Sequence, residues 1–141
     1  MHYSALEVHS LMAFPAASAR GIFSRMVPGE GSELSHLRRG ALEYCVLSLL
    51  FGRERYGLDI ARELTASGVL MSSEGTLYPL LARLRRAGWV TTSWQESTEG
   101  PPRRYYSLTA AGVAALEEFR RAWKVFRDAV DAALARSGEL S

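Results

Sequence analysis

The side chains in this sequence that could do chemistry are mostly arginines, and they gather in its second half. Arg83, Arg85 and Arg86 follow a run of leucines, and Arg103 and Arg104 follow a turn-rich segment. A guanidinium group binds phosphate oxygens through paired N–H donors. Between residues 75 and 108 these five arginines face only two acidic residues. This local excess favours contact with a nucleic-acid backbone over a merely solvated helix end.

The net charge of the whole chain conceals this excess. The 141 residues carry 17 basic and 15 acidic side chains, a formal charge of +2. Residues 37–108 hold 10 of the basic and 7 of the acidic residues, whereas residues 109–141 hold 5 of each. Charge segregation, and not the total, therefore indicates an anionic partner for residues 37–108.

Other kinds of site are poorly supported. His2, His9 and His36 have no cysteine or carboxylate at metal-ligand spacing, so we expect no metal site. The single cysteine, Cys45, excludes an intrachain disulfide and fits a small core residue in a reducing, cytoplasmic protein. No phosphate loop, nucleophile elbow or poised pair of carboxylates is present. We expect neither an enzyme nor a bound cofactor, and no secretory signal or membrane span.

The elements that must position the arginines follow from hydrophobic spacing and turn residues. The pattern predicts a mainly α fold with a small β-hairpin (α+β), in the order helix, helix, turn, helix, hairpin, long helix. The expected ranges are residues 35–51, 57–66 and 72–87 for the helices, 90–96 and 104–108 for the strands with a loop over 97–103, and 109–135 for the last helix. This order describes a winged helix-turn-helix domain with a C-terminal dimerisation helix.

The third predicted helix is the one that would enter a DNA groove. Its leucines at positions 77, 80, 81 and 84 recur at helical spacing and define the buried face. Pro79 removes a backbone donor, so we expect the helix to begin late or to bend near Tyr78. The opposite face, with Thr76 and Tyr78 at its margins, presents Gly75, Pro79, Ala82, Arg83 and Arg86.

The last predicted helix carries an apolar seam with heptad spacing. Its positions alternate in steps of 3 and 4 through Leu116, Phe119, Trp123, Phe126 and Val130. Such a seam is typical of a helix that packs against another helix, so we expect a homodimer. Two interpretations of its aromatic side chains remain open. They either line a pocket for a small aromatic effector or fill the dimer core.

Three segments together resemble the PadR family of transcriptional regulators over residues 37 to about 135. They are GTLYPLLARL at 75–84, AGWV at 87–90 and GPPRRYYSLTAAG at 100–112, with Tyr56-Gly57 also matching. Trp89 stands where the family usually has a smaller aliphatic residue. The resemblance implies a dimeric repressor with DNA contacts from Ser73, Thr76 and Tyr78, wing contacts from Arg103 and Arg104, and phosphate binding supported by Tyr56.

These patterns predict four parts of the chain. They are an N-terminal arm and linker at 1–36, a DNA-binding domain at 37–108, a dimerisation helix at 109–135 and a tail at 136–141. The expected function is sequence-specific binding of an inverted-repeat operator in double-stranded DNA by a repressor that a small molecule releases. The alternative is a winged-helix protein-interaction module that does not bind DNA.

Overall fold

The computed structural model describes residues 32–139 of the chain. Four α-helices, a short 3₁₀ turn and three strands follow one another as α3 (Ser32–Leu49), β1 (Arg55–Tyr56), α4 (Gly57–Thr65), η1 (Glu74–Thr76), α5 (Leu77–Arg86), β2 (Val90–Ser97), β3 (Gly100–Leu108) and α6 (Ala110–Glu139). The predicted arm and most of its linker lie outside the described residues.

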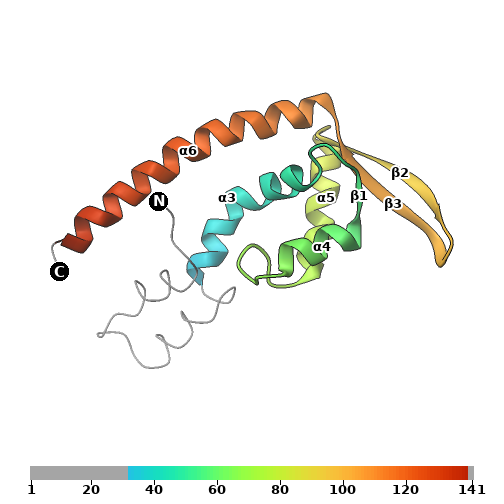
Figure 1. Cartoon of the computed structure of the whole chain (residues 1–141), viewed down its shortest axis with the longest axis horizontal. Coiled ribbons are helices and arrows are strands. Elements are labelled where there is room, and N and C mark those ends of the chain that lie inside the picture. Colours follow the sequence, from blue (N-terminus) through green and yellow to red (C-terminus); the bar gives the residue numbers. More distant parts are fainter. Residues whose placement is uncertain (1–31, 140–141) are drawn as a thin grey trace, which may run out of the picture.

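The helices and the hairpin are arranged as a winged helix (Figure 1). The antiparallel sheet has the order β1-β3-β2, and β1 pairs only with Tyr105 and Tyr106 of β3. The hairpin of β2 and β3, which we call the wing, projects from one end of the helical domain. At the other end α6 runs along α3 and continues past it. The predicted fold class is therefore confirmed.

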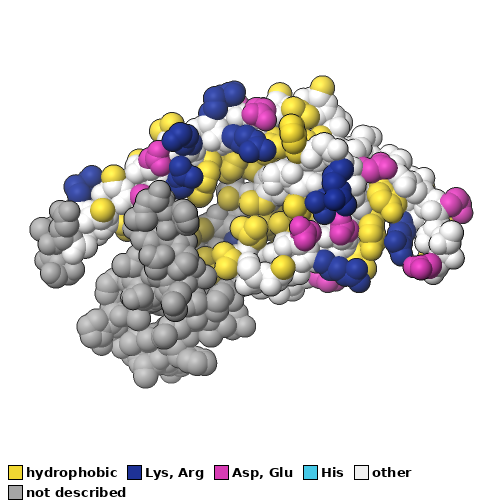
Figure 2. Space-filling view, viewed as in Figure 1, with side chains coloured by type: hydrophobic (Ala, Val, Ile, Leu, Met, Phe, Trp, Pro, Cys, Tyr) yellow, Lys and Arg dark blue, Asp and Glu magenta, His cyan; other side chains and the backbone are white. Residues whose placement is uncertain are grey.

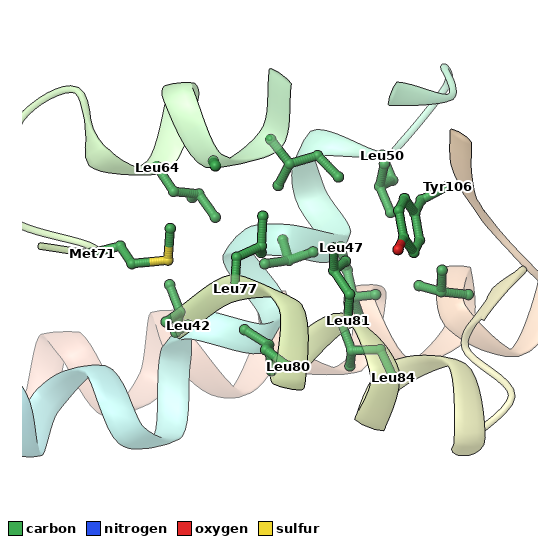
Figure 3. Close-up of a cluster of buried hydrophobic side chains, with 14 of the residues drawn as sticks. Leu42, Leu47, Leu50, Leu64, Met71, Leu77, Leu80, Leu81, Leu84 and Tyr106 are labelled. Atoms are coloured by element: carbon green, nitrogen blue, oxygen red, sulfur yellow. The ribbon is translucent and has the colours of Figure 1, made fainter. Parts of the chain in front are cut away.

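The core gathers beneath α5, where helices α3 and α4 and the base of the sheet converge (Figure 3). The four predicted leucines of α5 are all 5 % exposed or less. They pack with Leu47 of α3 and Leu50 directly after it, Ile60 and Leu64 of α4, and Tyr106 of β3. Each fully buried side chain of this size contributes about 1.5–3 kcal/mol. Because the leucine face of α5 is buried, the opposite face of the helix is the one that remains open to a partner.

The late start predicted for the third helix is confirmed. A 3₁₀ turn occupies Glu74–Thr76, and α5 begins at Leu77. Pro79 consequently lies in the first turn, where backbone N–H groups need no partner within the helix. Ser73 takes the N-cap position of the 3₁₀ turn, but within the described residues its side chain makes no capping hydrogen bond.

The predicted loop over residues 97–103 is wrong, because β3 begins at Gly100 and the turn is much tighter. Pro101 and Pro102, which suggested a loop, lie in β3 itself. There β3 has β2 on one side only, since β1 pairs further along the strand. Proline is tolerated on such an unpaired edge because no ladder donor is required of it. A register shift between Gln95 and Ser97 accommodates this region.

Thr109 caps the start of α6. Its hydroxyl accepts a hydrogen bond from the Gly112 N–H at 3.0 Å and donates one to the Gly88 carbonyl at 2.6 Å. The Thr109 N–H also donates to the Trp89 carbonyl at 3.1 Å. Because Gly88 and Trp89 directly follow α5, these bonds tie the start of α6 to the end of α5.

Both long helices extend beyond their predicted ends. α3 begins at Ser32 instead of Ser35, and α6 runs to Glu139 instead of residue 135. Within residues 32–139, no helix combines the length and the apolar character needed to cross a bilayer.

Candidate nucleic-acid interface

The outward face of η1 and α5 is open to solvent. Ser73, Thr76, Tyr78, Arg83 and Arg86 are all exposed, whereas the leucines between them are buried. All five side chains are therefore accessible to a partner. In the space-filling view, arginine and lysine side chains lie over α6 and over the part of the molecule that carries α4 and the wing (Figure 2).

Arg83 differs from the other four because it already has an anionic partner in the chain. Its guanidinium lies 3.0 Å from a carboxylate oxygen of Glu43 on α3. The ion pair turns the side chain toward the flank of α5 that faces α3. Sequence spacing placed Arg83 on the outward face but could not show this partner.

Tyr78 packs against α4 and still keeps part of its ring exposed. A Cβ atom added at Gly57 would lie 3.0 Å from the Tyr78 ring, so the ring packs across the first residue of α4. The side chain nevertheless remains 48 % exposed. Gly57 is therefore needed for this close approach, and the outer part of the Tyr78 ring remains open to a partner.

The two arginines of the wing lie on opposite faces of the hairpin. The Arg103 guanidinium stands 4.6 Å above the centre of the Tyr56 ring, and Tyr56 packs beside Tyr105. Arg104 stands 5.0 Å above the ring of Trp94, its cross-strand neighbour on β2. Sequence analysis did not single out Trp94. Counting alternate positions forward from the buried Val90 would have placed it on the inward face.

The aromatic side chains of α6 follow the predicted spacing but have unequal surroundings. Leu116 is 2 % exposed and belongs to the domain core, whereas Trp123, Phe126 and Val130 are 43 %, 61 % and 37 % exposed. Between them Phe119 stacks on Tyr44 of α3, with ring centres 4.1 Å apart and planes at 3°. The predicted seam therefore begins inside the chain's own core and leaves it after Phe119.

An apolar groove lies between α3, α6 and the loop after α4. Its volume is about 410 Å³, and its walls include Leu37 and Cys45 of α3, Leu70 of the loop, and Phe119 and Trp123 of α6. Burial raises the pKa of the Cys45 thiol, which favours the neutral, unreactive form. Burial and the nearby carboxylates of Glu43 and Glu118 raise the pKa of Tyr44, which also lines the groove.

Metal chemistry has no support in the described part of the chain. Between residues 32 and 139, no three side chains of the His, Cys, Asp and Glu types gather closely enough to hold an ion. His2 and His9 lie outside the described residues.

An open helix face beside an arginine-bearing wing defines the class of winged-helix DNA-binding proteins. A family model described as the transcriptional regulator PadR-like family matches residues 46–118. The chain belongs to this family, whose members are transcriptional regulators and not enzymes. The resemblance noted in the sequence is thus confirmed.

Individual relatives agree with this assignment. The chain is 38 % identical to the transcriptional regulator Rv3488 of Mycobacterium tuberculosis over 63 % of its own length and 81 % of that protein. A PadR-like regulator of Bacillus cereus has a similar crystal structure, with 33 % identity, a TM-score of 0.64 and coverage of 70 % of this chain and 96 % of that one. The crystal structure of a PadR family regulator of Eggerthella lenta is also similar, with 35 % identity, a TM-score of 0.64 and coverage of 73 % of this chain and 89 % of that one.

Proposed function

We propose that the protein is a cytoplasmic homodimeric repressor that binds an inverted-repeat operator and leaves it when a small aromatic molecule binds. The observation that supports this most directly is the uncovered outer face of η1 and α5, with Ser73, Thr76, Tyr78 and Arg86 exposed above a fully packed inner face. On this proposal α5 enters the major groove and the wing reaches the flanking backbone.

The outward face of α5 has a shape that fits the floor of the DNA major groove. Gly75, Pro79 and Ala82 are small and exposed, so the helix can approach base edges closely. Ala82 can contact a thymine methyl group, and the hydroxyl of Thr76 can hydrogen-bond to a base edge. Arg86 at the far end of the helix can bind a guanine or a phosphate.

Arg83 contributes differently on this proposal. It contacts DNA only by exchanging the Glu43 carboxylate for a phosphate, because its guanidinium is engaged in the ion pair. Both side chains are partly exposed, at 57 % and 23 %, so this exchange needs little rearrangement. Arg83 should therefore contribute less to the affinity than Arg86.

The distal part of α6 supports the proposed dimer. Trp123, Phe126 and Val130 of the heptad seam, and Leu134 one turn further on, expose apolar surface along one side of the helix where it has passed the domain core. A contiguous exposed apolar stripe with heptad spacing is typical of a helix that pairs with a second copy. A dimer with two-fold symmetry binds half-sites of opposite orientation, about 10 base pairs or a little more apart.

The groove beside α3 supports the proposed effector site. Its volume of about 410 Å³ lies within the range of sites for small molecules, and its walls are largely apolar. Phe119 and Trp123 form part of one wall, with ring centres 6.0 Å apart. Because Trp123 also belongs to the proposed dimer seam, a molecule stacked on it would change how the two α6 helices pack.

Selection of genomic fragments by the purified protein tests the DNA-binding part of the proposal. We expect the enriched fragments to share an inverted repeat, and the affinity to fall steeply as salt rises. Thr76→Ala and Arg86→Ala should each weaken binding to the selected repeat about 5- to 100-fold. Arg136→Ala, at the far end of α6, removes the same charge as Arg86→Ala and should have no effect. Retention of no fragment at moderate salt would instead favour a protein-interaction module.

A reporter gene placed behind the selected repeat tests repression. Expression should fall when the protein is present and recover in the Arg86→Ala variant. A rise in expression with the wild-type protein would identify an activator.

Sedimentation velocity tests the dimer. Phe126→Asp places a carboxylate in the exposed seam and should convert the protein to monomers. Val125→Asp, a neighbouring exposed position off the seam, should leave the dimer intact. Equal behaviour of the two variants would contradict the assigned interface.

Tryptophan fluorescence tests the effector site. A planar aromatic ligand in the groove should quench the fluorescence of the wild-type protein, and the quenching should be lost in Trp123→Ala. Unchanged binding in that variant would favour a filled dimer core in which Trp123 lines no cavity.

A further inference from the structure

We propose that the two neighbouring arginines of the wing have different tasks: Arg103 contacts a DNA phosphate, whereas Arg104 positions the wing from its opposite face and does not touch DNA. This inference deepens the proposed function and depends on it. Sequence and family resemblance treat the two arginines as one pair, but in the structure they lie on opposite faces of the hairpin, and the Nε atom of Arg104 is buried without a hydrogen-bond partner among the described residues.

The alternation of β3 separates the two side chains. Tyr106 is 7 % exposed and faces the core, so Arg104, two residues earlier, lies on that same inward face. Arg103 lies on the outward face with Tyr105. The register agrees, because Arg104 pairs with Trp94 and Arg103 pairs with Gln95. One flat surface applied to the wing therefore cannot reach both guanidinium groups.

Arg103 belongs to a surface that continues to α5. Its guanidinium lies 4.6 Å above the centre of the Tyr56 ring. The next residue, Gly57, lies beneath the half-exposed ring of Tyr78, which is on α5. The arginine of the wing and the DNA-facing helix are thus joined through two tyrosines, and β1, which carries Tyr56, runs beside β3 (Figure 1). A duplex seated on α5 would find Arg103 on the same side.

Arg104 is half-buried against the opposite face of the hairpin. Its guanidinium lies 5.0 Å above the centre of the Trp94 ring, and its Nε atom is buried without a hydrogen-bond partner among the described residues. A buried Nε–H cannot take part in the side-on pair of hydrogen bonds that an arginine can give to a phosphate. The stem and the stacked guanidinium of Arg104 instead cover apolar surface of the Trp94 ring. Trp94 remains 64 % exposed even with Arg104 over it.

The charge at the tip of the wing disfavours a binding mode in which both faces of the hairpin contact DNA. Insertion of the hairpin into a minor groove would bring Arg103 and Arg104 to opposite strands of the duplex. Glu96 and Glu99 are exposed at the tip, so their carboxylates would enter the groove first and be repelled by the phosphates. Contact through the outward face alone avoids this. On that face the carboxylate of Glu54 accepts a hydrogen bond from the Gln95 amide.

The test compares Arg103→Met with Arg104→Met. The two variants remove the same charge at adjacent positions and keep an apolar stem of similar length, so long-range electrostatics change equally. The probe is a random-sequence duplex of about 30 base pairs, because phosphate contacts do not depend on sequence. Affinity is measured over a series of salt concentrations. Each phosphate contact contributes about 0.9 to the slope of log affinity against log salt.

We expect Arg103→Met to lower the slope by about 1 and to weaken binding about 5- to 10-fold at 0.1 M salt. Arg104→Met should keep the wild-type slope and most of the wild-type affinity. Arg104→Ala, which uncovers Trp94, should change the tryptophan fluorescence and weaken binding without changing the slope. Recovery of affinity in Arg104→Met, which restores the stem but no charge, distinguishes positioning from phosphate contact.

Two outcomes overturn the inference alone. An equal loss of slope in both methionine variants would mean that the wing contacts both strands, and an unchanged slope in Arg103→Met would mean that Arg103 touches no phosphate. Circular dichroism checks folding, and the Arg103→Gln and Arg104→Gln pair repeats the comparison if a methionine variant misfolds. Salt-independent or absent binding by the wild-type protein would instead overturn the proposed function, and this inference with it.

Discussion

The head of the molecule, residues 41–119, and the distal part of α6, residues 120–139, use similar apolar side chains to opposite effect. In the head, Leu47, Leu77 and Leu81 are 1 % exposed or less. In the distal part, Phe126 is 61 % exposed and Leu134 is 47 % exposed. The head therefore completes its core within one chain. The distal part of α6 presents apolar surface that no other described part of the chain covers.

The difference teaches that one hydrophobic pattern can serve two purposes along a single helix. Leu116 and Phe126 belong to the same heptad seam, yet the first is buried in its own domain and the second is open to solvent. Spacing identifies the side of a helix that is apolar. Spacing does not identify what covers that side, because this depends on how far the packed domain extends along the helix.

Leu116→Ala should have the largest effect on stability. Its side chain is 2 % exposed and packs in the core of the head. Truncation leaves a cavity, and we expect the free energy of unfolding to fall by about 2–5 kcal/mol. Urea denaturation followed by circular dichroism measures the change. A loss below about 1 kcal/mol would place Leu116 with the open part of the seam.

Gly112→Ala should be the next most damaging change, because it acts where α6 meets the head. An added Cβ atom would lie 2.1 Å from the Trp89 carbonyl oxygen, so the start of α6 would have to move. We expect a loss of about 1–3 kcal/mol. The matched control is Gly40→Ala on α3, where a Cβ would meet no described atom within 4 Å.

At Gly40 the same substitution removes only the backbone freedom of glycine. It should therefore raise the free energy of unfolding by about 0.5–1 kcal/mol. If Gly112→Ala lowers the free energy of unfolding and Gly40→Ala raises it, the contrast supports a close contact between Gly112 and Trp89. Stabilisation by both would show that α6 is not held against Trp89.

Thr109→Ala should have a smaller effect at the same joint. The substitution removes the cap bond to the Gly112 N–H and the bond to the Gly88 carbonyl. The expected loss is about 1 kcal/mol, within the range measured for N-cap threonines. Thr109→Ser keeps the hydroxyl and should behave like the wild type in the same denaturation experiment. Equal losses in both variants would contradict a capping role.

Much of the head could be predicted from the sequence, because its signals are local. The leucines of α5, the late helix start at Pro79 and the cap at Thr109 each depend on residues a few positions apart. The length of β3 could not be predicted in this way. Pro101 and Pro102 disfavour a strand locally, and only the position of β1 shows that this edge needs no donor.

The candidate interface was predictable in its composition but not in its contacts. The alternation of side chains along a strand predicts that Arg103 and Arg104 lie on opposite faces of the hairpin. It does not predict their partners, Tyr56 and Trp94, because these come from other strands. The ion pair of Arg83 with Glu43 joins residues that are far apart in the chain. Pairings of this kind depend on tertiary packing, which single-sequence spacing does not contain.

Phe126→Ala should have the smallest effect on the stability of the isolated chain and therefore gives the sharpest contrast with Leu116→Ala. The ring is mostly exposed and alanine is the better helix former, so at low protein concentration the free energy of unfolding should change by less than about 0.5 kcal/mol. If a second copy covers the seam, the melting temperature of the wild type should rise with protein concentration, and this dependence should weaken in the variant. A large loss of stability at high dilution would mean that Phe126 packs within its own chain, and the contrast between the head and the distal part of α6 would not hold.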